Sequence, residues 1–201
     1  MSHSLHDQLA RQTLRQTLKG KRRALSMAQQ CSASQAIILP ILSQIAQHRA
    51  QHVAFYLASD GEIDPMPAMQ ACWQQQIQTY LPVLHPFRKG HLLFLHFTAD
   101  TPMQTNRYGI QEPQLSVQRV LPLQQLHLIF TPLVGFDAQG HRLGMGGGYY
   151  DRTLALNETL PAIGLAHDCQ QVAKIPTATW DQPLLQVITP ENHAIVNVKS
   201  K

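Results

Sequence analysis

Short apolar runs alternate with longer amphipathic segments along most of this chain. The run at residues 128–134 is short and flanked by turn-forming residues, which indicates a buried strand. Further strands are expected at residues 52–59, 77–84, 92–97, 162–166 and 185–189. Because helical segments separate most of these strands, the pattern predicts a three-layer, Rossmann-like α/β fold. Its central sheet should be mostly parallel, with helices on both faces.

The first 23 residues are predicted to form a basic N-terminal helix. An apolar stripe at helical spacing runs along it and just past it, at Leu14, Leu18 and Leu25. A second stripe is cationic and follows the spacing i, i+4, i+8 and i+11, at Arg11, Arg15, Lys19 and Arg22. One interpretation of this stripe is a solvated helix face. The other is that it lies over a phosphate site, because arginine presents a fork of hydrogen-bond donors.

Two more helices are expected before the middle of the chain. Ser26 and Gln29 have the spacing of a capping box, so a helix should begin there and continue to about residue 48. Pro40 should kink or interrupt that helix. Another helix is expected at residues 67–76. Residues 98–119 look irregular, and a loop of that length in a compact domain is often functional.

Four glycines in five residues, Gly144 to Gly148 around Met145, lie between the strand at 128–134 and a helix expected from about Tyr149. Backbone N–H groups in such a loop can approach a ligand, and the helix N-terminus that follows favours an anion. The spacing fits neither a P-loop nor G-x-G-x-x-G, because no Lys-Ser or Lys-Thr follows and Tyr149 occupies the sixth position. On the glycines alone, a tight structural turn and a phosphate cradle are equally good interpretations.

The residues around this loop favour the phosphate cradle. Arg142 comes just before the glycines, and Asp151 falls in the first turn of the following helix. An aspartate there can be no more than a partner for the helix dipole, or it can hold a magnesium ion that arrives with a nucleotide. Glu62 follows the first strand, where open α/β sheets place ligands, although a solvated turn residue would also fit.

Composition agrees with one globular domain spanning residues 1–201. The hydrophobic fraction of 44% is enough for a sizeable core, and no apolar run has transmembrane length. Three separated cysteines without a C-x-x-C argue against a zinc ribbon or a disulfide framework and fit a reducing cytoplasm. The eleven histidines include no H-x-x-x-H or H-E-x-x-H pair, which weakens a metal hypothesis based on them.

Positive charge is confined to one end of the chain. The formal net charge is +4, and six basic residues against Asp7 give residues 1–23 a net +5, which leaves −1 for the remainder. A nucleic-acid binder more often spreads its basic residues over a broad face. We therefore expect no nucleic-acid partner. The lack of a transmembrane run argues against a membrane partner, and nothing in the sequence indicates more than a monomer.

The stretch from Gly135 to Asp151, with R-L-G-M-G-G-G-Y-Y-D at its end, resembles the 5-formyltetrahydrofolate cyclo-ligase family, also called methenyltetrahydrofolate synthetase. Further blocks support the resemblance in the family's order, at residues 55–57, 60–63, 81–84, 106–113, 164–168 and 180–181. The resemblance implies conversion of 5-formyltetrahydrofolate, ATP and Mg²⁺ to 5,10-methenyltetrahydrofolate, ADP and phosphate. It also implies a phosphorylated formyl group, an iminophosphate, as the intermediate.

The same resemblance assigns residues to roles. It implies an ATP site formed by Arg11, Arg15, Arg142, Leu143, Gly144, Met145, Gly146, Gly147, Gly148, Tyr149 and Tyr150. It implies folate contacts from Leu57, Glu62 and Tyr149, and magnesium-associated carboxylates at Asp151 and Asp181. Arg142 and Tyr149 are the candidate catalytic residues. The family often has Lys at the position of Arg11, and many members have basic residues at those of Met145 and Gly147.

Two other functions remain possible on the residues alone. A different ATP-dependent ligase or kinase, acting on a small acid or amide, would keep the glycine-rich loop and need another substrate pocket. An RNA-binding protein could use the basic N-terminal helix as an arm on an α/β scaffold. Its binding should weaken steeply with salt and be insensitive to Mg-ATP.

Overall fold

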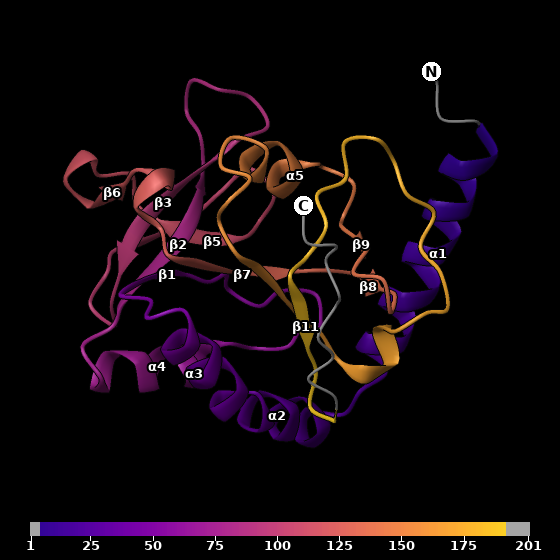
Figure 1. The fold of residues 1–201 in the computed structure, drawn as a ribbon, viewed down its shortest axis with the longest axis horizontal. Coiled ribbons are helices and arrows are strands. Elements are labelled where there is room, and N and C mark those ends of the chain that lie inside the picture. Colours follow the sequence, from indigo (N-terminus) through magenta and orange to yellow (C-terminus); the bar gives the residue numbers. More distant parts are fainter. Residues whose placement is uncertain (1–4, 192–201) are drawn as a thin grey trace.

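A computed structural model describes residues 5–191 and shows a seven-stranded sheet in the order β11-β10-β7-β1-β2-β3-β6 (Figure 1). The strands are β1 His52–Ala54, β2 Gln78–Leu84, β3 Leu92–Phe97, β6 Val120–Leu121, β7 Leu128–Pro132, β10 Ala162–Leu165 and β11 Gln186–Ile188. Neighbours from β11 to β2 pair in parallel, whereas β3 and β6 pair antiparallel at one edge. The predicted α/β class with a mostly parallel sheet is therefore confirmed.

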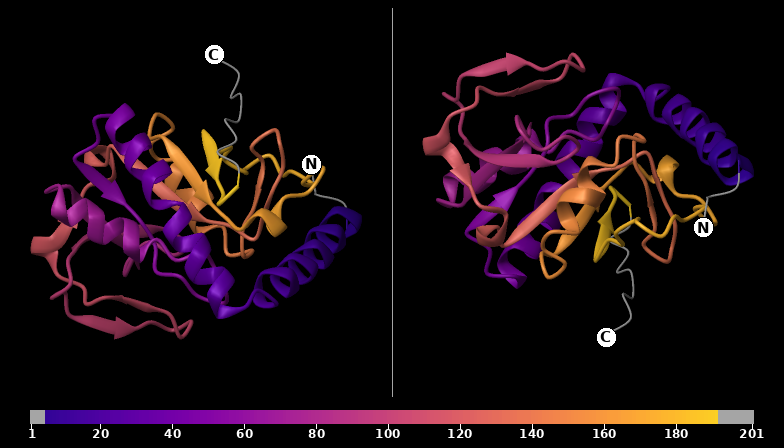
Figure 2. Two further views of the ribbon diagram at one scale, coloured as in Figure 1. Left: turned by 90° about the horizontal axis from the view of Figure 1, so that it is seen from below. Right: turned by 90° about the horizontal axis from the view of Figure 1, so that it is seen from above.

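Helices lie on both faces of this sheet. One face is covered by α2 Met27–Ala36, α3 Ile38–Gln47 and α4 Met66–Gln74, and α5 Tyr149–Leu154 lies on the other (Figure 1). The predicted basic helix is α1, Leu5–Arg23, which extends along one end of the molecule (Figure 2). It packs there against the short 3-10 helix η3, Asp168–Gln170.

The core has two halves, one on each face of the sheet. Val53 and Phe55 point to the face covered by α2, α3 and α4, whereas Ala54 between them points to the face that carries α5. This alternation follows from the period of two in a strand. Phe55 and Phe130 stack with ring centroids 4.9 Å apart. Burial on both faces explains why the central strands read as continuous apolar runs.

The first strand and the second helix differ from the prediction. The strand expected at residues 52–59 ends at Ala54, because the chain leaves the sheet to form a wall of the site described below. The single helix expected from Ser26 is two helices that meet at Ile37. Pro40 lies in the first turn of α3 and not at the break, since a proline needs no N–H donor in a first turn. The capping box at Ser26 and Gln29 is confirmed.

Several short elements were not expected. Residues 98–119 contain the hairpin of β4 Met103–Thr105 and β5 Gln111–Pro113 and the 3-10 helix η1 Val117–Arg119. A second hairpin joins β8 Gly135–Phe136 to β9 Arg142–Leu143, and η2 covers Leu123–Gln125. No helix within residues 5–191 is long and apolar enough to cross a membrane. The sequence also predicts a poorly fixed chain beyond Pro190. From residue 192 on, that stretch lies outside the described range.

Candidate active site

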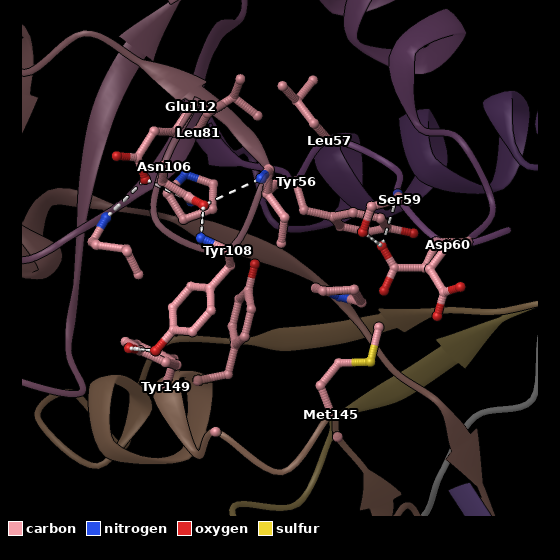
Figure 3. Close-up of a pocket in the computed structure, with 18 of the residues that line it drawn as sticks. Tyr56, Leu57, Ser59, Asp60, Leu81, Asn106, Tyr108, Glu112, Met145 and Tyr149 are labelled. Atoms are coloured by element: carbon pink, nitrogen blue, oxygen red, sulfur yellow. Dashed lines mark hydrogen bonds between the residues drawn. The ribbon is translucent and has the colours of Figure 1, made fainter. Parts of the chain in front are cut away.

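A cavity of about 630 Å³ opens at the carboxyl ends of β1, β2 and β7 (Figure 3). Its apolar lining comes from Tyr56, Leu57, Leu81, Pro82, Leu84, Ile110 and Pro132. Two further segments complete the walls: the β4–β5 hairpin and the loop between β9 and α5. This is the edge where open parallel sheets bind ligands, so the position agrees with that expected from the strand order.

The glycine-rich loop forms one wall of this cavity and requires glycine at two positions. Gly146 has φ 104° and Gly148 has φ 65°, both in the left-handed region. A Cβ at Gly148 would also lie 2.7 Å from Arg152 Nη1. Gly148 is the N-cap of α5 and has no side chain to satisfy the free N–H groups of that helix. The tight turn and the anion site are therefore compatible interpretations of the same glycines.

Arg142 lies beside the loop and is only partly satisfied. The side chain is buried, with 4% of the residue exposed, and Nη2 donates to Asp151 Oδ1 at 2.6 Å. Its Nη1 is buried and has no hydrogen-bond partner within residues 5–191. A buried guanidinium N–H without an acceptor costs free energy. The site thus offers a donor to an anionic or carbonyl oxygen of a ligand.

The predicted cationic stripe of α1 divides among three places. Arg15 Nε donates to the carbonyl of Gly144 at 2.8 Å, which brings this arginine onto the glycine-rich loop. Burial, with a smaller effect of the neighbouring Arg11, lowers the pKa of Arg15. Further along α1, Lys19 and Arg22 contact Asp60 and do not reach the loop. The hypothesis that the whole stripe faces phosphate is therefore wrong for Arg22.

The remaining residue of the stripe pairs with one of the predicted metal ligands. Arg11 Nη1 lies 2.6 Å from Asp181 Oδ2 and also donates to the carbonyl of Pro176. Asp181 Oδ2 accepts a second bond from the Ala178 N–H, and Oδ1 accepts from Arg11 Nη2 at 3.2 Å. Neither Arg11 nor Asp181 lines the cavity. Both oxygens of Asp181 are occupied, so this carboxylate fits a metal only if Arg11 leaves it.

Asp151 fits a metal better. It lines the cavity, and Oδ1 accepts from Arg142 and from the Gln182 N–H, whereas no bond to Oδ2 is found within the described part of the chain. No group of three or more His, Cys, Asp or Glu residues between residues 5 and 191 forms a ready-made metal centre. Mg²⁺ often takes one or two protein carboxylates and completes its shell with phosphate oxygens and water. Asp151 is thus suited to a metal that arrives with a nucleotide.

The three predicted folate contacts, Leu57, Glu62 and Tyr149, all line the cavity. The hydroxyl of Tyr149 bonds to the hydroxyl of Tyr108 and accepts from Arg107 Nη2, each at 2.8 Å. The bond to Tyr108, and then that to Arg107, lowers the pKa of Tyr149. In Figure 3, Tyr108 and Tyr149 lie on one side of the cavity and Ser59 and Asp60 on the opposite side.

Some of the other predicted site residues line the cavity and some do not. Those that line the cavity are Arg142, Gly144, Met145, Gly147, Gly148, Tyr149, Tyr150 and Asp151. Leu143, the last residue of β9, and Gly146 in the loop do not line the cavity. Sequence reasoning assigned no role to Asn106, Tyr108 and Glu112, which form the wall from the β4–β5 hairpin. Two features of the sequence pointed to them: the unusual length of the loop and the block at residues 106–113 that supports the family resemblance.

Comparisons with known proteins agree with this geometry. The model of the 5-formyltetrahydrofolate cyclo-ligase family matches residues 7–190. The 5-formyltetrahydrofolate cyclo-ligase of Haemophilus influenzae is 48% identical over 89% of this chain and 96% of its own length. That of Escherichia coli K12 is 45% identical over 86% and 96%. The solved structure of 5,10-methenyltetrahydrofolate synthetase from Aquifex aeolicus superposes with a TM-score of 0.79 at 25% identity, covering 95% of both chains. The chain therefore belongs to the 5-formyltetrahydrofolate cyclo-ligase family.

Proposed function

We propose that this ligase of folate one-carbon metabolism uses ATP and Mg²⁺ to convert 5-formyltetrahydrofolate to 5,10-methenyltetrahydrofolate, releasing ADP and phosphate. The observation that carries the proposal is Arg142 Nη1, a buried donor beside the glycine-rich loop that has no acceptor among residues 5–191. A phosphoryl group in transfer supplies the acceptor that this donor lacks.

ATP binds along the glycine-rich loop in this proposal. The N–H groups at the start of α5 and the positive end of its dipole face the phosphates, and Arg142 and Arg15 flank them. Folate occupies the apolar part of the cavity, between Leu57 and Glu62 on one side and Tyr149 on the other. The two substrates thus meet at the loop, where Arg142 is placed to contact the group that moves between them.

The reaction proceeds in two steps. The formyl oxygen attacks the γ-phosphorus and ADP leaves, which gives the phosphorylated formyl group on ring nitrogen 5. Nitrogen 10 then attacks the formyl carbon, its proton is released, and phosphate leaves with the former formyl oxygen. Phosphoryl transfer depends on positioning and charge neutralisation more than on a protein nucleophile. Arg142 stabilises charge on the transferred group, and Tyr149 orients the folate.

Asp151 is the residue that would hold Mg²⁺ in this proposal, and the metal would neutralise charge on the ATP phosphates. Arg142 donates a hydrogen bond to Asp151 Oδ1, and this bond keeps the carboxylate directed at the loop. Asp181 contributes indirectly, because its ion pair with Arg11 fixes α1 near the loop.

Methenyl formation, followed by its absorbance with purified protein, 5-formyltetrahydrofolate and Mg-ATP, tests the proposal. Arg142→Lys keeps the positive charge and loses the fork, so we expect kcat to fall roughly a hundredfold. Equal turnover without nucleotide, or with EDTA present, would contradict the proposal. A panel of formylated amino acids and small amides, assayed for ATP turnover, distinguishes the folate ligase from a ligase or kinase for another acid or amide.

A further inference from the structure

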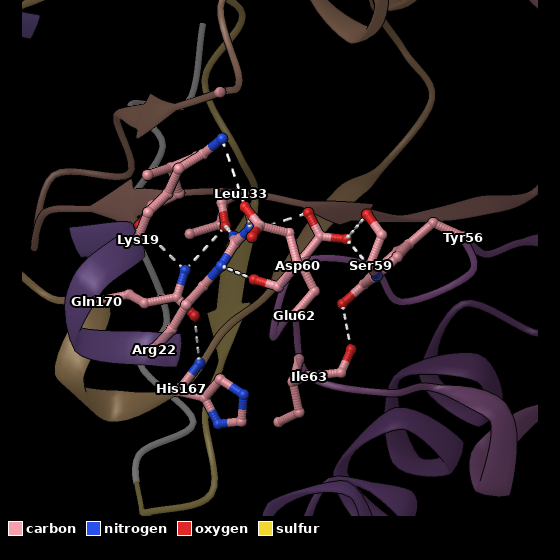
Figure 4. Close-up of polar contacts among 12 residues, drawn as sticks. Lys19, Arg22, Tyr56, Ser59, Asp60, Glu62, Ile63, Leu133, His167 and Gln170 are labelled. Carbon is pink, nitrogen blue, oxygen red and sulfur yellow. Dashed lines mark hydrogen bonds and ion pairs between the residues drawn. The ribbon is translucent and has the colours of Figure 1, made fainter. Parts of the chain in front are cut away.

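Glu62 is a buried carboxylate in the cavity wall, and its contacts come from two directions (Figure 4). The residue is 8% exposed, and Oε2 accepts from the N–H of Ser59 at 3.1 Å and from its hydroxyl at 3.3 Å. These two bonds close the turn that follows β1. From the other direction, Oε1 lies 3.7 Å from Nη1 of Arg22 on α1.

Arg22 is fully buried, with 0% of the residue exposed, and it uses every guanidinium nitrogen. Nε donates to the carbonyl of Asp60 at 2.8 Å, and Nη2 pairs with Asp60 Oδ2 at 3.0 Å. Nη1 donates to the carbonyl of Leu133, just after β7, at 3.3 Å, and faces Glu62. One side chain from α1 therefore joins the turn after β1 to the segment after β7. The turn lines the cavity, and so does Pro132, the last residue of β7.

We propose that Arg22 is a positioning residue for the folate side of the site: from α1 it fixes the turn of Asp60 and Glu62 and keeps the Glu62 carboxylate charged and directed at the cavity. This inference rests on the proposed function for the role of Glu62 as a folate contact. Arg22 does not line the cavity, so it acts through Glu62 and not by touching substrate.

The charges around Glu62 explain why a buried cation is needed. Burial raises the pKa of Glu62, Arg22 and the Ser59 bonds lower it, and Asp60 raises it. Tyr56, which follows β1, and Tyr150 of α5 also face the carboxylate. Burial raises the pKa of both phenols, so they are neutral at physiological pH. Arg22 is the cation in direct contact with Glu62 that offsets burial and the charge of Asp60.

Arginine is also required for its shape. Its planar fork serves two carbonyl groups and two carboxylates at once, whereas a lysine ammonium has three donors on a flexible stem. Arg22→Lys keeps the charge and cannot keep all four contacts. The Glu62 carboxylate should then lose its nearest cation or its orientation, while the glycine-rich loop is untouched.

The pH profile of kcat/KM for 5-formyltetrahydrofolate tests the proposal. In Arg22→Lys the acidic limb should move up by about one pH unit, because a neighbouring opposite charge shifts a carboxyl pKa by about that much or more. The KM for folate should rise roughly tenfold, and the KM for ATP should stay within about twofold. Arg23→Lys is the matched control, because Arg23 is the next residue and contacts Asp60 without reaching Glu62. This variant should change neither the KM for folate, nor the KM for ATP, nor the pH of the acidic limb of the profile.

Asp60→Asn guards against the case in which Arg22→Lys fails to fold. It removes the charge that raises the pKa of Glu62 and leaves the Asp60 carbonyl bond to Arg22 intact. The acidic limb should therefore move down, opposite to its shift in Arg22→Lys. General structural damage would not give shifts of opposite sign. An unmoved limb in Asp60→Asn overturns the proposal, as does an equal rise of both KM values in a folded Arg22→Lys.

A double-mutant cycle with Glu62→Gln separates action through Glu62 from other effects. In the Glu62→Gln background, Arg22→Lys should no longer change the limb and should change the KM for folate by less than about twofold. A full additional effect overturns the proposal. Folate affinity can be measured without nucleotide, so this test does not depend on the proposed ATP-dependent reaction. Failure of the proposed function would instead appear as turnover by the wild type without ATP.

Discussion

Arg15 of α1 contacts the glycine-rich loop through its bond to Gly144. We expect Arg15→Ala to raise the KM for ATP roughly tenfold, since a charge-assisted contact to phosphate contributes about 1.5–3 kcal/mol. The KM for folate should change by less than about twofold. Lys21→Ala is the matched control, because Lys21 is an exposed cation of the same helix. A rise confined to the KM for folate would place α1 at the other end of the cavity.

Asp137 is a buried carboxylate that holds the turn between β8 and β9, just before the glycine-rich loop. Oδ1 accepts from the N–H groups of Gln139 and His141, and Oδ2 accepts from the Ile175 N–H at 2.9 Å and from His141 Nδ1 at 3.0 Å. Burial alone would raise the pKa of Asp137, but these bonds outweigh it and the pKa is lowered. Because the folded-state pKa lies below the unfolded value, the stabilisation is present above pH about 3.9 and is lost as pH falls through the folded pKa.

Asp137→Asn should lower the free energy of unfolding by about 2–3 kcal/mol at neutral pH, because an amide NH₂ would oppose the donors now bound to Oδ2. Urea titrations at neutral pH and at pH about 3 measure this difference, which should shrink in acid. A difference that stays constant with pH would contradict the role assigned to the ionised carboxylate. Ser43→Ala, an exposed side chain of α3, serves as the neutral control.

Among the elements, α1 contains a weak point at Gly20. A Cβ there would meet no atom of residues 5–191 within 4 Å, and the position is exposed in the last third of a 19-residue helix. Gly20→Ala should therefore raise the free energy of unfolding by about 0.5–1 kcal/mol, through reduced backbone entropy of the unfolded chain. Kinetic constants should not change, because Gly20 does not line the cavity. Destabilisation measured by urea titration would contradict the placement of this helix face in solvent.

Long, regular elements were predictable because their patterns are local. The strand at 92–97 matches β3, and the helix expected from Tyr149 begins there. The break at Ile37 was misplaced because it depends on packing: Ile37 is fully buried and belongs to the core on the α4 face. The strands of the β4–β5 and β8–β9 hairpins are only two or three residues long, too short to show a period of two.

At the scale of the whole molecule, residues far apart in the sequence pair beside Arg15, which contacts the glycine-rich loop. Arg11 and Asp181 are 170 residues apart in sequence and form a bond of 2.6 Å. The block around the glycines was predictable because strand, loop and helix start lie within one short stretch. Tyr108 and Glu112 were not assigned a role from sequence, and Arg22 was placed in the cationic stripe, because the contacts of all three are tertiary and no local spacing encodes them. The same holds for the predicted metal ligands Asp151 and Asp181. Asp151 pairs with Arg142 and Asp181 with Arg11, and neither contact can be predicted from local spacing.

Thermal unfolding with ligands tests how nucleotide, metal and fold are linked. A ligand that binds only the folded protein, present at a hundred times its Kd, stabilises it by about 2.7 kcal/mol, or roughly 5–10 °C for a chain of this size. If Asp151 holds the metal, Mg-ATP should raise the Tm of the wild type by several degrees more than ATP with EDTA. Asp151→Asn should abolish that increment. Asp181→Asn should lower the starting Tm, since it breaks the pair with Arg11, and retain the increment. Loss of the increment in Asp181→Asn but not in Asp151→Asn would reverse the assignment, with Asp181 leaving Arg11 to bind the metal.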